Sequence, residues 1–253
     1  IMIAPPHGGA LASGRNGMGR MMEPERLLET IGSVLTPTDW VGRNVLVTAG
    51  PTQESLDPVR FLSNHSSGKM GYAIAERAAA RGATVHLIAG PTQLSTPPGV
   101  QLTRIKTTND LLAACDSLVT LCDTFIMAAA PADYRPKTIS DHKLKKNPGE
   151  ITVELEPNPD ILLTLKPKRE KCFTVGFAAE SENLLANAKD KLTRKNLDII
   201  VANDITAKDA GFGVDTNAVT FLFSNGEKEV LPTLPKLEVA ERLLDEILQR
   251  SRL

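Results

Sequence analysis

A polar loop that ends in glycine and lysine has residue types and spacing that point to chemistry. Residues 63–71 read Ser-Asn-His-Ser-Ser-Gly-Lys-Met-Gly and precede an Ala-rich, helix-like segment. Ser66 or Ser67 is placed to cap that helix, whose free N–H groups and positive dipole end favour an anion. Gly68 lets the backbone approach a ligand, and Lys69 adds positive charge. We therefore predict a phosphate site at Ser66, Ser67 and Gly68, with an ordinary serine-capped helix as the alternative.

A second loop combines small residues with positive charge. Residues 128–136 read Ala-Ala-Ala-Pro-Ala-Asp-Tyr-Arg-Pro, and the small side chains allow a flat ligand to lie close to the backbone. Asp133 is suited to accept hydrogen bonds from a ribose or a base, or to help hold a metal. Over residues 133–146 five basic side chains face two acidic ones, a balance of +3. A basic flap of this kind suits a polyphosphate, and a solvated charged loop is the alternative.

Three further segments carry candidate functional side chains. Phe177 lies at the end of one run and is suited to stack on a base. Lys191 and Lys195 lie one helical turn apart, which fits either phosphate contacts or a solvated helix face. Asn203 and Asp204 follow another run and form either ligand contacts or a plain turn.

The scaffold that positions these loops follows from the periodicity of apolar residues. Short apolar runs predict buried strands, and amphipathic segments between them predict helices. The predicted strands span residues 44–48, 84–89, 124–130, 151–155, 172–177 and 197–202. The predicted helices span residues 24–34, 69–81, 109–122, 160–165, 183–194 and 235–250. Residues 219–223 and 228–231 flank Asn225-Gly226, which predicts a hairpin.

This order of elements predicts the fold class. Alternating strands and helices indicate an α/β protein with a Rossmann-like, mainly parallel sheet, helices on both faces and an antiparallel hairpin near the C-terminus. Ligands of such sheets bind beyond the carboxyl ends of the strands, and the polar loops described above follow predicted strands. Residues 35–42 have the character of a linker.

The composition argues against a nucleic-acid-binding protein and against a membrane protein. The 253 residues are 42% hydrophobic, enough for a buried core, and the net charge of -1 gives no global field for nucleic acid. The apolar runs are far shorter than the roughly 20 residues needed to cross a bilayer, and the start lacks a signal-peptide pattern. We expect no membrane association and a cytoplasmic location. Cys115, Cys122 and Cys172 have no metal or redox spacing and are expected to be buried small hydrophobic residues.

Seven stretches carry a resemblance to one enzyme family. They are TAGPTQESLDPVRFLSNHSSGKMG, AAAPADYRP, KLKK, PNPDIL, VGFAAE, RKNLDIIVAND and the C-terminal LDEIL helix. In this order they resemble phosphopantothenoylcysteine synthetase, the CTP-dependent ligase of bacterial coenzyme A biosynthesis. The resemblance covers residues 43–250 and assigns residues 43–253 to the synthetase domain.

The resemblance implies a reaction and roles for individual residues. The enzyme would join 4′-phosphopantothenate to L-cysteine through an acyl-cytidylate, converting CTP to CMP and pyrophosphate. Lys143 would neutralise charge on the triphosphate, Asn64 would hold the acyl-cytidylate for attack by cysteine, and Arg60 would support that step. The positions that match nucleotide contacts are Met127, Ala128, Ala129, Asp133, Lys143, Pro159, Asp160, Ile161, Leu162, Phe177, Lys191 and Lys195.

The resemblance also bears on the N-terminal residues, the cofactors and the assembly. Residues 1–42 are assigned to the tail of a phosphopantothenoylcysteine decarboxylase module plus a linker, and Ser13 stands where many relatives have Cys. The chain begins with Ile1, and we expect it to be a fragment of a longer polypeptide that contains the decarboxylase module. We expect no decarboxylase activity and no FMN, Mg²⁺ bound with CTP through unassigned ligands, and a homodimer.

Two functions are alternatives to the ligase. A nicotinamide-dependent oxidoreductase on a Rossmann sheet is disfavoured because residues 63–71 do not form G-x-G-x-x-G and because Gly90-Pro91-Thr92, rather than an acidic residue, follows the second strand. A non-catalytic module that binds a phosphorylated metabolite is the other alternative, and release of pyrophosphate from CTP separates it from the ligase.

Overall fold

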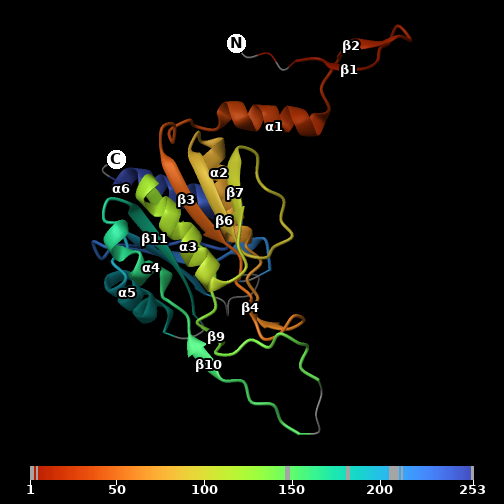
Figure 1. Ribbon diagram of the computed structural model, residues 1–253. Coiled ribbons are helices and arrows are strands. Elements are labelled where there is room, and N and C mark those ends of the chain that lie inside the picture. The colour runs from red at the N-terminus through yellow and green to blue at the C-terminus, as the bar shows by residue number, and fades with distance from the viewer. Residues whose placement is uncertain are drawn as a thin grey trace. The chain divides into compact units, whose positions relative to one another are not determined.

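The chain folds into two compact units, Ile1–Asp39 and Trp40–Leu253. The computed structural model describes residue 3 and residues 5–145, 149–180, 183–204, 211 and 213–251 (Figure 1). None of the helices within these residues has the length and apolar character needed to cross a membrane.

The N-terminal unit contains a hairpin and a helix. Strands β1 (His7–Ala10) and β2 (Asn16–Arg20) pair antiparallel, and α1 spans Pro24–Leu35 with its proline in the first turn. The helix confirms the prediction for residues 24–34. The hairpin was not predicted, because its strands contain four glycines and lack the apolar alternation that marks a half-buried strand.

An eight-stranded sheet forms the centre of the larger unit. In spatial order the strands are β15 (Lys228–Val230), β14 (Val219–Phe223), β12 (Ile199–Asp204), β11 (Phe173–Glu180), β8 (Thr124–Met127), β3 (Asn44–Ala49), β6 (Thr84–Ala89) and β7 (Val100–Arg104). The six strands from β12 to β7 are parallel, and β14 and β15 add an antiparallel hairpin. The predicted Rossmann-like fold, including its terminal hairpin, is confirmed.

Helices cover both faces of this sheet, as Figure 1 shows. They are α2 (Lys69–Ala80), α3 (Thr108–Leu118), α4 (Ile161–Thr164), α5 (Leu184–Arg194) and α6 (Lys236–Arg250), with 3₁₀ turns η1 (Val119–Leu121) and η2 (Lys166–Lys168). Two hydrophobic cores result, one with α2 and α6 and the other with α3, α4 and α5. Along β3, Val45 and Val47 enter the first core and Leu46 the second, because successive strand side chains point to opposite faces.

Among the described residues of the larger unit, three short antiparallel pairs lie outside the main sheet. They are β4 (Glu54–Ser55) with β5 (Phe61–Leu62), β9 (Tyr134–Pro136) with β10 (Leu155–Pro157), and β13 (Thr216–Asn217) with β16 (Leu234–Pro235). We call residues 137–154, which connect β9 to β10, the arm, and describe residues 137–145 and 149–154 of it. Figure 1 shows these residues extending away from the sheet. The strand predicted at residues 151–155 is wrong, because Ile151 and Val153 are 55% and 41% exposed and find no surface to bury their alternating face.

The start of α2 also differs from the prediction. Neither Ser66 nor Ser67 caps the helix; Gly68 is its N-cap, with φ of 78° and no side-chain cap bond. A Cβ at Gly68 would lie 2.9 Å from Thr92 Cγ2 and 3.3 Å from the backbone of Gly50. Glycine at position 68 is therefore needed both for its left-handed conformation and for close packing of two loops.

Two boundaries moved for identifiable reasons. The strand predicted at residues 124–130 ends at Met127, after which the chain turns so that the Ala130 amide bonds to the Gly50 carbonyl at 2.9 Å. The helix predicted at residues 109–122 begins at Thr108, behind a capping box formed by Thr107 and Asp110.

Candidate functional site

A cavity of about 300 Å³ opens beyond the carboxyl ends of β8 and β11. Its lining comes from Met127, Ala129, Pro131, Ala132, Asp133, Asn158, Pro159, Asp160, Ile161, Leu162, Phe177 and Lys195. Nine of the twelve positions predicted to contact a nucleotide are in this lining. The structure thus gathers four segments that are far apart in the sequence around one space.

The strand order places this cavity next to a reversal of the chain. The chain continues from β3 toward β6 and from β8 toward β11, in opposite directions across the sheet. Open α/β sheets bind ligands outside the carboxyl ends of the strands near such a reversal. Ala129 and Ala132 keep the wall after β8 thin, and Phe177 of β11 supplies an aromatic face.

Lys195 and Asp160 form an ion pair in the cavity wall. The Lys195 Nζ lies 2.9 Å from Asp160 Oδ2, with side chains 19% and 31% exposed. Asp160 also caps α4, accepting a hydrogen bond from the Leu163 amide at 3.2 Å. The ion pair holds the Lys195 ammonium group in place at the edge of the cavity. Lys191, one turn earlier on α5, is not in the lining.

Arg169 connects the Leu162 and Lys195 segments of this wall through hydrogen bonds. Its side chain is buried and donates to the carbonyls of Leu162 at 3.3 Å, Asn196 at 3.0 Å and Lys195. Leu162 and Lys195 both line the cavity. Burial lowers the pKa of the guanidinium, which nevertheless stays charged at neutral pH. Sequence reasoning missed Arg169 because nothing in its neighbourhood marks a residue that bonds only to distant carbonyls.

A buried polar network supports the opposite wall. Glu54 Oε1 accepts bonds from the amide and the hydroxyl of Thr108, both at 2.8 Å, and Thr108 Oγ1 lies 3.0 Å from Thr52 Oγ1. Thr52 Oγ1 accepts from the Ala132 amide at 2.9 Å, and Asn158 Nδ2 donates to the Ala132 carbonyl at 2.9 Å. Ala132 and Asn158, which the prediction did not assign to the site, are thereby held in the cavity lining.

Asn64 lies beside the loop that follows β8. Its Nδ2 donates to the Ala130 carbonyl at 2.7 Å, and its Oδ1 accepts from the Ser66 amide at 3.0 Å. The exposed Asn64 amide therefore fixes the Ser66 loop against the cavity wall that includes Ala129 and Pro131. Its predicted place near the strand ends is observed, and its contacts add a connection that the sequence did not indicate.

Lys69 does not contribute a free positive charge to the predicted phosphate site. Its Nζ donates to Asp215 Oδ1 at 2.7 Å and to the Gly213 carbonyl at 2.8 Å. The hydrogen bond from Lys69 lowers the pKa of Asp215, which keeps that carboxylate ionised. Lys69 therefore joins the start of α2 to residues 213–215, and the predicted phosphate site would depend on backbone N–H groups of its loop.

Arg60 and the arm meet at a buried carboxylate. Asp57 Oδ2 accepts from Arg60 Nε at 2.9 Å and from the Leu144 amide at 3.1 Å, while Arg60 Nη2 donates to the Leu144 carbonyl at 2.8 Å. The Asp57 side chain is fully buried, and its bond to Arg60 holds its pKa well below the usual range. Arg60 therefore anchors the residue that directly follows Lys143.

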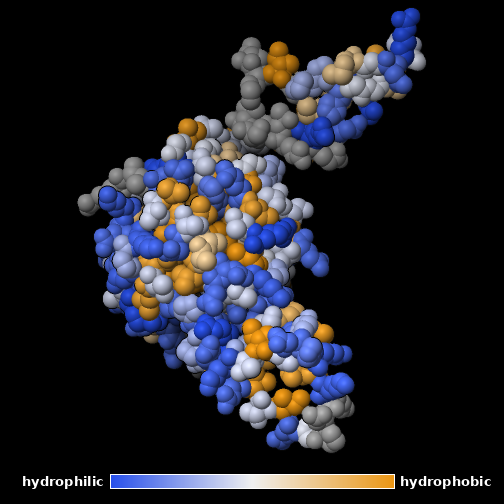
Figure 2. All heavy atoms as spheres, viewed as in Figure 1, coloured by the Kyte–Doolittle hydropathy of each residue, from blue (hydrophilic) through white to orange (hydrophobic). Residues whose placement is uncertain are grey.

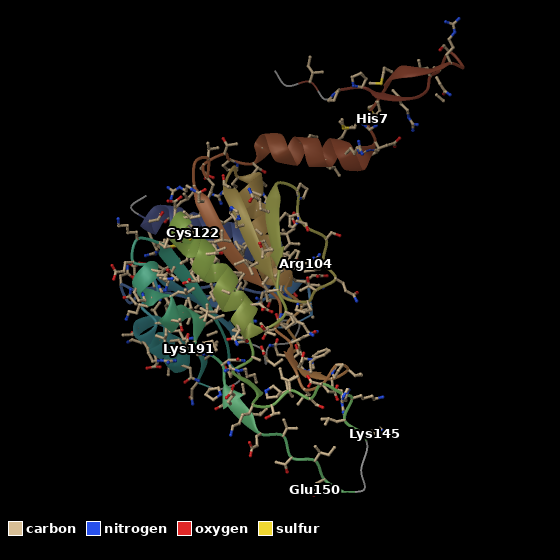
Figure 3. The ribbon with its side chains drawn as sticks, in the orientation of Figure 1. His7, Arg104, Cys122, Lys145, Glu150 and Lys191 are labelled. Carbon is tan, nitrogen blue, oxygen red and sulfur yellow. The ribbon has the colours of Figure 1, made fainter. Side chains whose placement is uncertain are left out.

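Lys143 itself is exposed and does not line the cavity. It belongs to the arm, whose outer part carries Lys145 and Glu150 away from the sheet (Figure 3). Lys146 lies outside the described residues. Ala128, the remaining predicted nucleotide contact, follows Met127 but is not in the lining either.

The described residues contain no group of three His, Cys, Asp or Glu side chains that could hold a metal ion. Asp133 and Asp160 are the carboxylates in the cavity lining, and Asp160 pairs with Lys195.

Comparison with known proteins places this site in a family. The family described as "DNA/pantothenate metabolism flavoprotein C-terminal domain" matches residues 40–250. The coenzyme A biosynthesis bifunctional protein CoaBC of Bacillus subtilis (strain 168) is 45% identical over 251 residues, 98% of this chain and 62% of that protein. The CoaBC of Escherichia coli (strain K12) is 42% identical over 255 residues, 99% of this chain and 63% of that protein. The chain thus spans under two thirds of the length of these curated relatives.

Solved structures agree with this placement. The C-terminal domain of a CoaBC protein superposes with a TM-score of 0.72 at 42% identity, covering 83% of this chain and 95% of that one. A Cab2 mutant in complex with phosphopantothenate-cysteine shares the fold, with a TM-score of 0.67 at 19% identity, covering 90% and 92%. The chain belongs to the family of the DNA/pantothenate metabolism flavoprotein C-terminal domain.

Proposed function

We propose that this chain is a ligase of coenzyme A biosynthesis that joins 4′-phosphopantothenate to L-cysteine at the expense of CTP. The observation that carries the proposal is the convergence of nine predicted nucleotide-contacting residues on one cavity at the strand ends. Two further facts support it: the curated relatives are named as coenzyme A biosynthesis proteins, and a Cab2 structure of the same fold holds phosphopantothenate-cysteine.

In the first half-reaction, a carboxylate oxygen of 4′-phosphopantothenate attacks the α-phosphorus of CTP. The new P–O bond gives an acyl-cytidylate, and the bond to the β-phosphate breaks to release pyrophosphate. Negative charge grows on the leaving oxygens, and lysines stabilise it as point charges. Lys195 is held at the cavity by Asp160, and Lys143 would approach on the arm.

In the second half-reaction, the amine of cysteine attacks the acyl carbon, the amide forms as the nitrogen gives up a proton to water, and the acyl C–O bond breaks to release CMP. This step depends on orientation, because the amine must reach the carbonyl along a defined line. Asn64 contributes by fixing the Ser66 loop to the Ala130 carbonyl, and Arg60 contributes by anchoring the arm through Leu144. Neither side chain carries protons in this scheme.

Magnesium enters this proposal with the nucleotide. Mg²⁺ is usually bound through one or two carboxylates together with substrate phosphates. Asp133 in the cavity lining is the carboxylate that fits this role, since Asp160 already pairs with Lys195. When bound, the ion would neutralise part of the triphosphate charge.

Pyrophosphate release tests the whole assignment. The protein is supplied with Mg²⁺, 4′-phosphopantothenate and either CTP or ATP, and pyrophosphate is measured before and after cysteine is added. We expect pyrophosphate with CTP, and CMP plus the amide once cysteine is present. Faster release with ATP would show the nucleotide assignment to be wrong. No release with any nucleotide would favour a non-catalytic binding module, and a calorimetric signal with NAD(P)H would favour the oxidoreductase.

We also propose that the chain forms a homodimer. Exposed apolar side chains support this, namely Val230 on the edge strand β15 and Val59, Phe61, Ile139, Ile151 and Val153 on and near the arm. Unpaired edges and apolar patches of this kind commonly mark interfaces. A monomeric mass in light scattering together with full activity would contradict the proposal.

A further inference from the structure

Two cysteines that are fifty residues apart in the sequence lie side by side in the fold. The Sγ atoms of Cys122 and Cys172 are 3.3 Å apart. Cys122 lies two residues before the start of β8, and Cys172 directly precedes β11, which pairs with β8. Cys172 is buried in the hydrophobic core as predicted, and Cys122 packs against that core half-buried, but the sequence did not indicate that the two sulfurs meet.

The positions of the two sulfurs permit a disulfide. Thr124 of β8 is the register partner of Phe173 of β11, so the residues just before the two strands lie on neighbouring parallel chains. The Sγ separation of 3.3 Å has to shorten only to the roughly 2.0 Å of an S–S bond. Both side chains pack against the same hydrophobic core, so rotation about their Cα–Cβ bonds brings the sulfurs together.

The two sulfurs differ in their access to solvent. Cys122 is half-buried and lines a cavity of about 190 Å³ together with His86 and Leu121. Cys172 is 6% exposed, and the hydrogen bond with Cys122 together with burial raises its pKa. A small oxidant would therefore meet Cys122 first, and Cys172 is placed to attack the product.

We propose that Cys122 and Cys172 form an oxidisable dithiol that a hydroperoxide converts to an intramolecular disulfide. The Cys122 sulfur attacks one peroxide oxygen, the O–O bond breaks, and Cys122 sulfenic acid forms with release of water or an alcohol. The Cys172 sulfur then attacks the Cys122 sulfur, the S–S bond forms, and the S–O bond breaks to release water. The two thiols lose two electrons and two protons in total, and the peroxide is the two-electron acceptor.

This site is separate from the proposed ligase chemistry. The dithiol lies at the amino ends of β8 and β11, while Met127 and Phe177 line the cavity at the carboxyl ends of the same strands. Figure 3 shows Cys122 at the end of the domain opposite to the arm. A bond between the two strand starts constrains the unfolded chain, and we expect a melting temperature roughly 5–10 °C higher. The ligation rate should stay the same.

Intact-mass spectrometry of the full chain tests the proposal. The reduced protein is exposed to hydrogen peroxide and then alkylated with iodoacetamide under denaturing conditions. We expect a product 2 Da lighter before alkylation, one alkylated cysteine in place of three, and a peptide that crosslinks Cys122 to Cys172. Dithiothreitol should restore all three alkylation sites. Cys115 provides the matched control, because it is fully buried, its pKa is raised to about 12 by burial, and it should remain the alkylated cysteine.

Serine variants of the three cysteines identify which of them form the disulfide. Cys115→Ser should still form the disulfide, whereas Cys122→Ser and Cys172→Ser should not. Three alkylated cysteines after peroxide treatment would overturn the proposal, as would sulfinic acid at Cys122 or a crosslink between two chains in place of the internal bond. The measurement on the unmodified chain decides the question even if a serine variant fails to fold.

Discussion

The cavity wall and the arm are built in opposite ways. The wall is supported from behind by Arg169 and by the network that runs from Glu54 to Asn158, so its polar groups already have partners. The described residues of the arm leave most of their side chains exposed, and hydrophobic and hydrophilic side chains lie next to one another on it (Figure 2). Within the described residues, the arm is connected to the rest of the unit by the β9–β10 pair, by the bond from the Ser140 amide to the Leu56 carbonyl at 3.0 Å and by the contacts of Leu144 with Asp57 and Arg60.

For the proposed ligase reaction, this difference predicts that the cavity wall and the arm have separate roles. A fixed wall suits recognition of a base and a ribose, because pre-formed contacts lower the entropy that binding must overcome. A long, exposed segment that carries Lys143 suits charge neutralisation in a step where the triphosphate changes shape. If this is right, changes in the wall should weaken nucleotide binding, and changes in the arm should slow the chemical step.

The largest effect is expected from Lys143→Ala. Loss of one charge-assisted contact to a transition state costs roughly 2.7–4 kcal/mol, or about 10²–10³ in rate. Acyl-cytidylate formation, measured as pyrophosphate release in a single turnover, should fall by that factor with little change in CTP affinity. Lys145→Ala is the matched control, since Lys145 is an exposed lysine of the same arm. An unchanged rate for Lys143→Ala would remove Lys143 from the mechanism.

Asn64→Asp should separate the two half-reactions. The new carboxylate can still accept from the Ser66 amide, but it cannot donate to the Ala130 carbonyl, and its charge repels the cytidylate phosphate. We expect pyrophosphate release to continue and the acyl-cytidylate to accumulate, with transfer to cysteine at least about tenfold slower. Mass spectrometry of the quenched reaction detects the intermediate. Its absence, or amide formation at the normal rate, would show that Asn64 has a different role.

Arg169→Leu tests the wall. The substitution removes the guanidinium donor from the carbonyls of Leu162, Asn196 and Lys195. A carbonyl that stays buried without a donor costs roughly 1–3 kcal/mol, and one that water reaches costs less. We expect a lower melting temperature and a KM for CTP roughly tenfold higher, with kcat changed less. Arg169→Lys should recover part of the affinity. A purely structural role would lower stability without this split between KM and kcat, and Arg194→Leu on the exposed face of α5 gives the baseline.

Asp57→Asn should have the smallest effect, limited to the arm. The pKa of Asp57 lies below its ordinary value, so its ionised form stabilises the fold fully above about pH 4, and this contribution is lost only as the pH falls further. We expect the variant to be cut faster by protease within residues 137–154, equally at pH 5 and pH 8. A difference that grows between these two pH values would mean that another group holds the arm.

Local patterns were sufficient to locate most of the scaffold. Apolar runs of a few residues predicted the strands β3 and β6, helical periodicity predicted α2, and the Asn225-Gly226 turn predicted the β14–β15 hairpin. The same approach failed at residues 151–155, where alternation was present but no second surface covered it. It also missed β7, a five-residue edge strand, since the prediction left residues 100–104 without an element.

The sequence by itself therefore determined the α/β class, the order of its main elements and the loops that follow its strands, because these depend on neighbours within one or two turns of chain. The tertiary structure decided which loops share a cavity, that Arg169 supports its wall, that Lys143 lies on the arm, and that Cys122 meets Cys172. These outcomes depend on strand order and register, which arise from contacts between residues tens of positions apart, and no local pattern encodes such a distance.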